Sequence, residues 1–171
     1  IVNKDGSFQR TARFRGPDLD SAVAAELVAV AGRINNAFRR LGSGWSIFVE
    51  AQRSEAATYP DSTFPDPASG LVEEERKADF EEAGIHFVSD YFLTILYLPP
   101  AEDAARAETW LYEGREQSGV DPHEVMRGFI DRTDRVLALL DGFMPECGWL
   151  DDTETLTYLH STVSTKRHRV R

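Results

Sequence analysis

Hydrophobic and polar residues alternate at the start of the chain in the way expected of a β-hairpin. Residues 1–2 are apolar, the turn sequence Lys-Asp-Gly-Ser occupies residues 4–7, and an alternating run covers residues 8–15. Asp-Gly between two extended runs is a strong short-range hairpin signal. The pattern predicts an N-terminal hairpin, which a Gly-Pro-Asp break at residues 16–18 separates from a helix.

A long amphipathic helix is predicted next, because large apolar residues recur at spacings of three and four along residues 19–41. We expect Asp18 or Asp20 to cap its start and Gly42 to end it in a left-handed turn. The apolar stripe consists of Leu19, Val23, Leu27, Val30, Ile34, Phe38 and Leu41.

Two further apolar segments are typical of strands. Residues 45–50 predict one strand, and the almost continuously apolar residues 91–98 predict a central strand buried on both faces, Leu96 included. Between them, Asp66-Pro67 is a helix-start pair. The helix that follows, to about residue 83, has few large apolar residues and is expected to be peripheral.

The rest of the chain is predicted to be mainly helical. Pro99 and Pro100 end the strand and start a short helix to about residue 112, and residues 121–124 form a capping box that opens another helix. Residues 144–150 are compatible with a short edge strand, and Asp151 is expected to cap a last helix to about residue 164. The core-facing residues of the second helix are Val125, Phe129, Val136, Leu140 and Phe143, and the last helix has Leu156, Leu159 and Val163 on one side.

The order of these elements favours an α+β fold. We predict a two-layer sandwich with a mainly antiparallel sheet and an N-terminal hairpin, ferredoxin-like (split βαβ) with extra helices. A doubly wound α/β sheet is the alternative. Residues 1–165 are assigned to one domain, and residues 166–171 to the start of a linker.

Composition and charge narrow the class of protein. The chain has 171 residues, enough for one domain with a real core, and its single cysteine, Cys147, excludes an internal disulfide framework. The net charge is −10, and residues 45–119 alone carry 16 acidic and 5 basic groups. A surface this acidic repels nucleic acid and is most simply a solvated face.

Several motifs in order resemble the N-terminal domain of TrbE-type conjugal-transfer ATPases, the CagE/TrbE/VirB family of type IV secretion. They are the opening run NKDGS…FRGPDL, Phe-Pro-Asp-Pro at residues 64–67, YFLTILYLPP at residues 91–100 and LTYLHSTVSTKRHRV at residues 156–170. These are packing and turn motifs that carry no chemistry themselves. The chain starts without Met and stops in a basic run, so we expect an excised domain whose parent continues on both sides.

No catalytic motif accompanies this resemblance. The sequence lacks the G-x-x-x-x-G-K-[ST] loop with which transfer ATPases hold phosphates, and Gly42-Ser43-Gly44 follows a helix, where it is expected to act as a helix stop. His160 is expected to be a partly buried histidine with satisfied hydrogen bonds, and Cys147 a packed thiol. A free-standing enzyme would have to assemble its site from scattered residues such as Glu50, Asp152 and His160. We therefore expect no catalytic, cofactor-binding or metal-binding residues in this chain.

The basic end of the chain is the one concentrated charge feature. Lys166, Arg167, Arg169 and Arg171 could form a linker or interface, or they could bind DNA or anionic lipid. We favour the linker, because so acidic a body opposes DNA binding.

The resemblance implies a function for the parent protein. It implies an ATPase on the cytoplasmic face of a bacterial inner membrane that powers pilus biogenesis and DNA or protein export, with ATP and Mg²⁺ held in an absent C-terminal motor. This chain is expected to be the non-catalytic assembly and docking domain. Its expected partners are other inner-membrane subunits of the type IV secretion system, through which it contacts the membrane, and other copies of the parent. A nucleic-acid-binding module that uses the basic C-terminal segment is the alternative.

Overall fold

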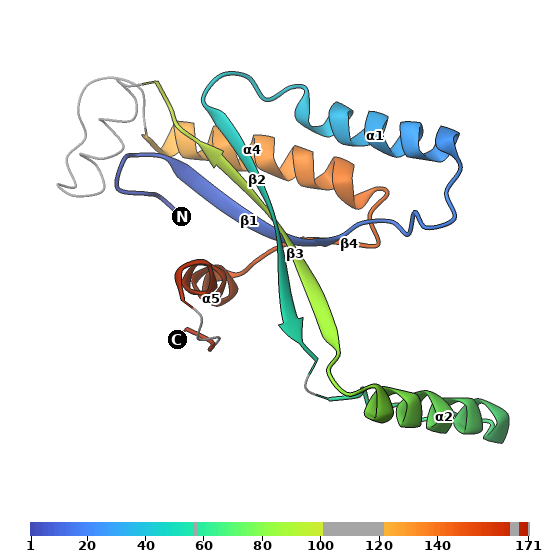
Figure 1. Cartoon of the computed structure of the whole chain (residues 1–171). Coiled ribbons are helices and arrows are strands. Elements are labelled where there is room, and N and C mark those ends of the chain that lie inside the picture. Colours follow the sequence, from blue (N-terminus) through green and yellow to red (C-terminus); the bar gives the residue numbers. More distant parts are fainter. Residues whose placement is uncertain (57, 101–121, 165–167, 171) are drawn as a thin grey trace. The chain divides into compact units, whose positions relative to one another are not determined.

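The computed structural model describes residues 1–56, 58–100, 122–164 and 168–170, and it divides into two compact units. One unit consists of Ile1–Glu50 and Tyr91–Arg171, and the other of Ala51–Asp90. The elements follow the order β1 (Phe8–Arg15), α1 (Ala24–Phe38), β2 (Trp45–Glu55), α2 (Pro67–Ala83), β3 (Phe87–Tyr97), α4 (Pro122–Asp141), β4 (Glu146–Trp149) and α5 (Asp152–Val163) (Figure 1).

The four strands form one antiparallel sheet in the order β2-β3-β1-β4. Strand β1 pairs with β3 from Phe8↔Tyr97 to Phe14↔Tyr91, and with β4 from Ala12↔Trp149 to Arg15↔Glu146. Strand β3 therefore lies between β1 and β2, so that β1, α1 and β2 form a split βαβ unit. The α+β prediction is confirmed, and the doubly wound alternative is wrong because the ladders are antiparallel.

The N-terminal turn forms as predicted, although its first arm is short. Val2 and Phe8 make an isolated bridge, and Gly6 adopts a φ of 76°. The Asp5 carboxylate accepts hydrogen bonds from the Ser7 hydroxyl, at 2.6 Å, and the Ser7 backbone N–H, at 3.0 Å. These bonds hold the pKa of Asp5 below its ordinary value.

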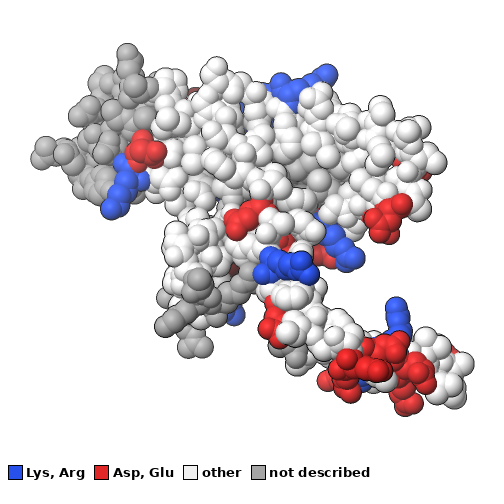
Figure 2. Space-filling model, in the orientation of Figure 1, with Lys and Arg blue, Asp and Glu red and all other residues white. Residues whose placement is uncertain are grey.

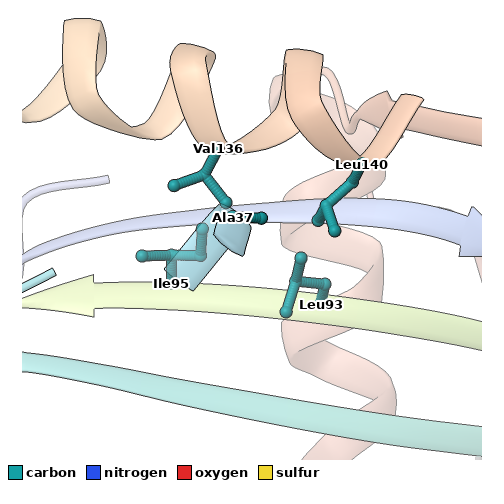
Figure 3. Packing of buried hydrophobic residues seen from close by; sticks show 5 residues of the cluster. All are labelled: Ala37, Leu93, Ile95, Val136 and Leu140. Carbon is teal, nitrogen blue, oxygen red and sulfur yellow. The ribbon is translucent and has the colours of Figure 1, made fainter. Parts of the chain in front are cut away.

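The core lies between the sheet and the helix pair α1 and α4. Val136 and Leu140 of α4 point toward Leu93 and Ile95 of β3, with Ala37 of α1 beside them (Figure 3). A second cluster joins Phe8 of β1 to Phe129 of α4, whose ring centroids are 5.6 Å apart. The core-facing set predicted for α4 is confirmed: Phe129, Val136 and Leu140 are buried, and Val125 and Phe143 pack against them.

Strand β3 is buried on both faces, as predicted. Leu93 and Ile95 face α4, while Phe92 and Thr94 are buried on the opposite face. There the ring of Phe92 packs against Tyr158 of α5, with centroids 4.6 Å apart. Leu96, however, is only partly buried, so the expectation of full burial fails at that position.

Helix α1 is shorter than its apolar stripe predicts. Leu19 and Ala22 close a turn instead of joining the helix, and the cap is formed by Glu26, whose carboxylate accepts from the Val23 N–H at 3.0 Å. The Asp18 carboxylate accepts from the Asp20 N–H instead, so neither aspartate caps the helix.

The left-handed glycine after α1 is Gly44, at φ 83°, and not Gly42, which has no positive φ. Gly44 approaches the end of β3 closely, because a Cβ at this position would lie 2.5 Å from the Leu98 carbonyl oxygen. A side chain here would therefore collide with backbone, and so the local requirement for glycine falls at residue 44.

Helix α5 begins as predicted but buries a different side. Asp151 caps it, accepting from the Glu154 N–H at 2.7 Å. The buried residues are Thr155 and Tyr158, whereas Leu156 is half-exposed and Val163 is 85% exposed. The phenol decides the orientation, because its ring packs on β3 while its hydroxyl finds a polar partner, as buried tyrosines require.

In the smaller unit, α2 is capped by Asp66 and has no buried residue, which confirms a helix without core contacts. Acidic side chains gather over α2 (Figure 2), which contains six acidic and two basic residues. The hydrophobic contacts of this unit include Tyr59, Phe80 and His86, whose rings stack in series. The helix expected after Pro100 and the cap expected at Asp121 lie outside the described residues.

Candidate functional site

The scattered polar residues that might have formed an enzyme site do not meet. The Glu50 carboxylate accepts from the Tyr158 hydroxyl at 2.8 Å. Asp152 lines a separate cavity of about 480 Å³ beside Arg10 and Trp149, and neither Glu50 nor His160 lines it. In the described part of the chain, no three His, Cys, Asp or Glu side chains are placed to hold a metal ion.

The polar network beside this cavity holds β1 on α4. The Arg10 guanidinium donates to Asp134 at 2.7 Å and to Thr133 at 2.9 Å, and it lies 4.0 Å from the ring centroid of Trp149. The Trp149 indole N–H donates to the same carboxylate at 2.8 Å. Sequence reasoning missed this network, because Arg10 appears in the sequence as one polar position of an alternating strand.

The two other residues weighed for chemistry are placed as follows. Burial, and to a lesser degree the charge of Asp141, raises the pKa of the Cys147 thiol to about 11, so the thiol stays protonated at neutral pH. His160 is partly buried as expected, but its Nε2 has no hydrogen-bond partner among the described residues. The expectation of a satisfied histidine is therefore wrong, because the neighbouring ring of His168, 4.5 Å away, meets it edge-on without a hydrogen bond to Nε2.

The segment that contains the basic residues returns to α5. The Val170 N–H donates to the Thr157 hydroxyl at 3.1 Å, and the ring of His168 lies against His160. Arg169 is exposed. Lys166, Arg167 and Arg171 lie outside the described residues, so their assignment to a linker or interface stays a prediction.

Exposed apolar surface is the strongest functional feature of the larger unit. On α1, Leu27 is 46% and Val28 72% exposed, and Val23 is exposed as well. Only Ala37 is buried along this helix, so its C-terminal end is fixed to the core while its N-terminal half presents apolar side chains to solvent. Contiguous exposed apolar surface of this kind marks sites of interaction with proteins or membranes.

A second exposed apolar segment lies on the edge strand β2. Ile47, Phe48 and Val49 are 40%, 55% and 67% exposed. Sequence reasoning predicted the strand but not its edge position, and three consecutive apolar residues would ordinarily indicate burial. No helix in the described part of the chain is both long and apolar enough to cross a membrane.

Comparisons with known proteins agree with this picture of an interaction surface without a catalytic centre. Residues 1–105, which include β1 through β3, match the family described as type IV secretion system ATPase VirB4/TrbE, N-terminal domain. The conjugal transfer protein TrbE of Rhizobium radiobacter is 38% identical over 115 residues, which are 66% of this chain and 14% of that protein.

A second relative is much closer in length. A probable conjugal transfer protein TrbE of Sinorhizobium fredii is 39% identical over 102 residues, which are 58% of this chain and 68% of that protein. The chain thus corresponds to a small portion of one relative and to most of the other. It belongs to the family of the N-terminal domain of type IV secretion ATPases, the VirB4/TrbE family of conjugal transfer.

Proposed function

We propose that the chain is the assembly and docking domain of a TrbE-like ATPase and takes no part in catalysis itself. The parent's motor would bind ATP and Mg²⁺ and power pilus biogenesis and export of DNA or protein. The domain would sit on the cytoplasmic side of the bacterial inner membrane. The observation that carries the proposal is the exposed apolar half of α1 in a chain that belongs to this family.

The chemistry of α1 favours an apolar protein surface as its partner. Residues 19–32 contain two acidic residues, Asp20 and Glu26, and no Lys or Arg. A helix that binds anionic lipid carries basic residues on its polar face, which α1 lacks over this stretch. We therefore assign α1 to contacts with the inner-membrane subunits of the secretion system, which would link the domain to the membrane.

Co-purification tests this assignment. The tagged chain is expressed with the inner-membrane subunits of its transfer system, solubilised in mild detergent and captured. We expect the subunits to be retained by the unaltered chain and lost with the double variant Leu27→Glu and Val28→Glu. Val163→Glu is the matched control, because it also places a carboxylate at an exposed apolar position of a helix, on α5. Equal retention by the double variant and the control would refute the docking role of α1.

The basic segment is proposed to connect the domain with the motor in cis. The bond from Val170 to Thr157 supports this proposal, because it ties the segment to the body of the domain. Fluorescence anisotropy with labelled single- and double-stranded DNA at physiological salt is the test. We expect no tight binding. Binding that vanishes when Lys166, Arg167, Arg169 and Arg171 are changed to Ala would instead support a nucleic-acid-binding module.

A further inference from the structure

The outer edge of β2 lacks the features that usually protect a sheet edge. The sheet order gives β2 one neighbouring strand, β3. Natural edge strands are usually protected by Lys, Pro, bulges or very short length. Residues 45–49, Trp-Ser-Ile-Phe-Val, contain no charge and no proline, and they belong to the larger unit. Such an edge is a template for pairing with another strand.

The register with β3 determines which peptide groups point outward. The Leu98 N–H donates to the Gly44 carbonyl and the Ala56 N–H to the His86 carbonyl, both at 2.8 Å. The two bonds fit a single antiparallel register without a bulge, in which even-numbered residues of β2 bond to β3. The N–H and C=O groups of the odd-numbered residues, Ile47 among them, therefore point to the outer edge.

The side chains of this segment alternate between the two faces of the sheet. Trp45 stacks on Phe129 of α4, with centroids 5.7 Å apart, while Glu50 bonds to Tyr158 of α5. Because successive side chains alternate, Ile47 and Val49 project on the α4 face and Phe48 on the α5 face. Both faces of the edge are therefore apolar next to the outward peptide groups.

We propose that β2 pairs antiparallel with β2 of a second copy of this chain, about a two-fold axis at Phe48. In this register Phe48 lies opposite Phe48 of the second copy, Ile47 opposite Val49, and Ser46 opposite Glu50. Odd-numbered residues then exchange the new hydrogen bonds, as their outward peptide groups require. The two sheets join into one, and the contact is the same on both copies, as a closed dimer demands.

Neighbouring registers are poorer. An axis at Ile47 places Phe48 opposite Ser46, and an axis at Val49 places Phe48 opposite Glu50. The axis at Phe48 alone matches apolar with apolar on both faces, and it sets the charge of Glu50 against a neutral hydroxyl. Opposed apolar pairs stabilise a strand pair and opposed like charges destabilise it.

The near-symmetry of residues 46–50 about Phe48 is the reason to name a second copy as the occupant. A six-residue strand pair buries little surface, so the dimer is expected to be weak and dependent on concentration. The inference rests on the proposed assembly role, which it deepens. The two can fail separately: a strictly monomeric chain that still captures inner-membrane subunits would refute this dimer and leave the docking role intact.

Disulfide trapping tests the register. In a Cys147→Ser background, Phe48→Cys places two thiols opposite each other in a non-hydrogen-bonded pair, where Cα atoms are about 4.5 Å apart, close enough for a disulfide. Ile47→Cys is the matched control, because its counterpart lies on the diagonal, roughly 7–8 Å away. We expect Phe48→Cys to form a covalent dimer under mild oxidation much faster than Ile47→Cys. Equal rates, or no dimer from Phe48→Cys, would overturn the register.

Sedimentation equilibrium of the 171-residue chain tests the association itself. Ile47→Pro removes an outward N–H without touching the β3 ladder, since proline is tolerated at the free side of an edge strand. We expect the unaltered chain to dimerise with rising concentration and Ile47→Pro to remain monomeric with an unchanged circular dichroism spectrum. A monomeric unaltered chain, or a folded Ile47→Pro that dimerises equally, would refute the proposal. If Ile47→Pro does not fold, the disulfide comparison decides.

Discussion

At the scale of single residues, burial changes sharply between neighbours in β3. Ile95 is fully buried among Val136 and Leu140, while the adjacent Leu96 is only partly covered. Both belong to the same apolar run, and the sequence pattern does not distinguish them. The difference arises because alternate side chains face different layers, and the α4 face is covered more completely at this point than the other.

Replacing Ile95 by Ala should therefore destabilise the chain more than replacing Leu96. A fully buried aliphatic residue truncated to Ala costs about 2–5 kcal/mol, because the core loses the transferred methyl groups and keeps part of the cavity. Urea denaturation followed by circular dichroism measures the free energy of unfolding of both variants. A smaller loss for Ile95→Ala than for Leu96→Ala would show that the core is placed on the wrong residue.

At the scale of elements, the sequence predicts where helices and strands form better than what covers them. The stripe on α1 correctly indicates a helix, but burial of Leu27 also needs a partner surface, which an apolar pattern cannot reveal. The same holds for α5, where the predicted apolar side is largely exposed and Tyr158 is buried instead. Apolar periodicity identifies a face, and tertiary contacts decide whether that face is used.

The cap of α5 is predictable from sequence, because it depends on a few neighbouring residues. Asp151 and Glu154 form a reciprocal pair at the start of α5, each carboxylate accepting from the other residue's backbone N–H. Asp151→Ala should lower the free energy of unfolding by about 0.5–2 kcal/mol. Asp152→Ala, one residue into the helix, is the control and should cost less in the same thermal or chemical denaturation experiment. Equal losses would mean that general helix-dipole effects, and not the cap, stabilise this helix.

At the scale of the whole molecule, the family and the fold were predictable, while the interaction surface was not. Motif order indicated the family, and the strand order β2-β3-β1-β4 follows from the predicted split βαβ arrangement. The exposed surfaces of α1 and β2 escaped prediction because their sequences are as apolar as a core. A chain that belongs to an ATPase family and yet lacks a phosphate loop is best understood as a domain with a role in assembly.

The absence of a phosphate loop leads to a direct biochemical prediction. Titration calorimetry of the 171-residue chain with Mg-ATP should show no heat beyond dilution, because no loop in its sequence has the pattern that cradles phosphates with backbone N–H groups. A related chain that includes an intact motor domain serves as the positive control. Saturable micromolar binding to this chain would require a nucleotide site of another kind and would contradict the prediction.

The central claim is that this chain carries docking contacts and no motor, and mating assays test it most directly. The chain is overproduced in donor cells that carry the intact transfer system, and transfer frequency is counted. Because the isolated domain would occupy docking sites without supplying ATP hydrolysis, we expect transfer to fall. The fall should persist with Val163→Glu and disappear with the Leu27→Glu and Val28→Glu double variant at equal protein levels. Unchanged transfer despite abundant folded chain, or equal inhibition by the double variant, would contradict the account.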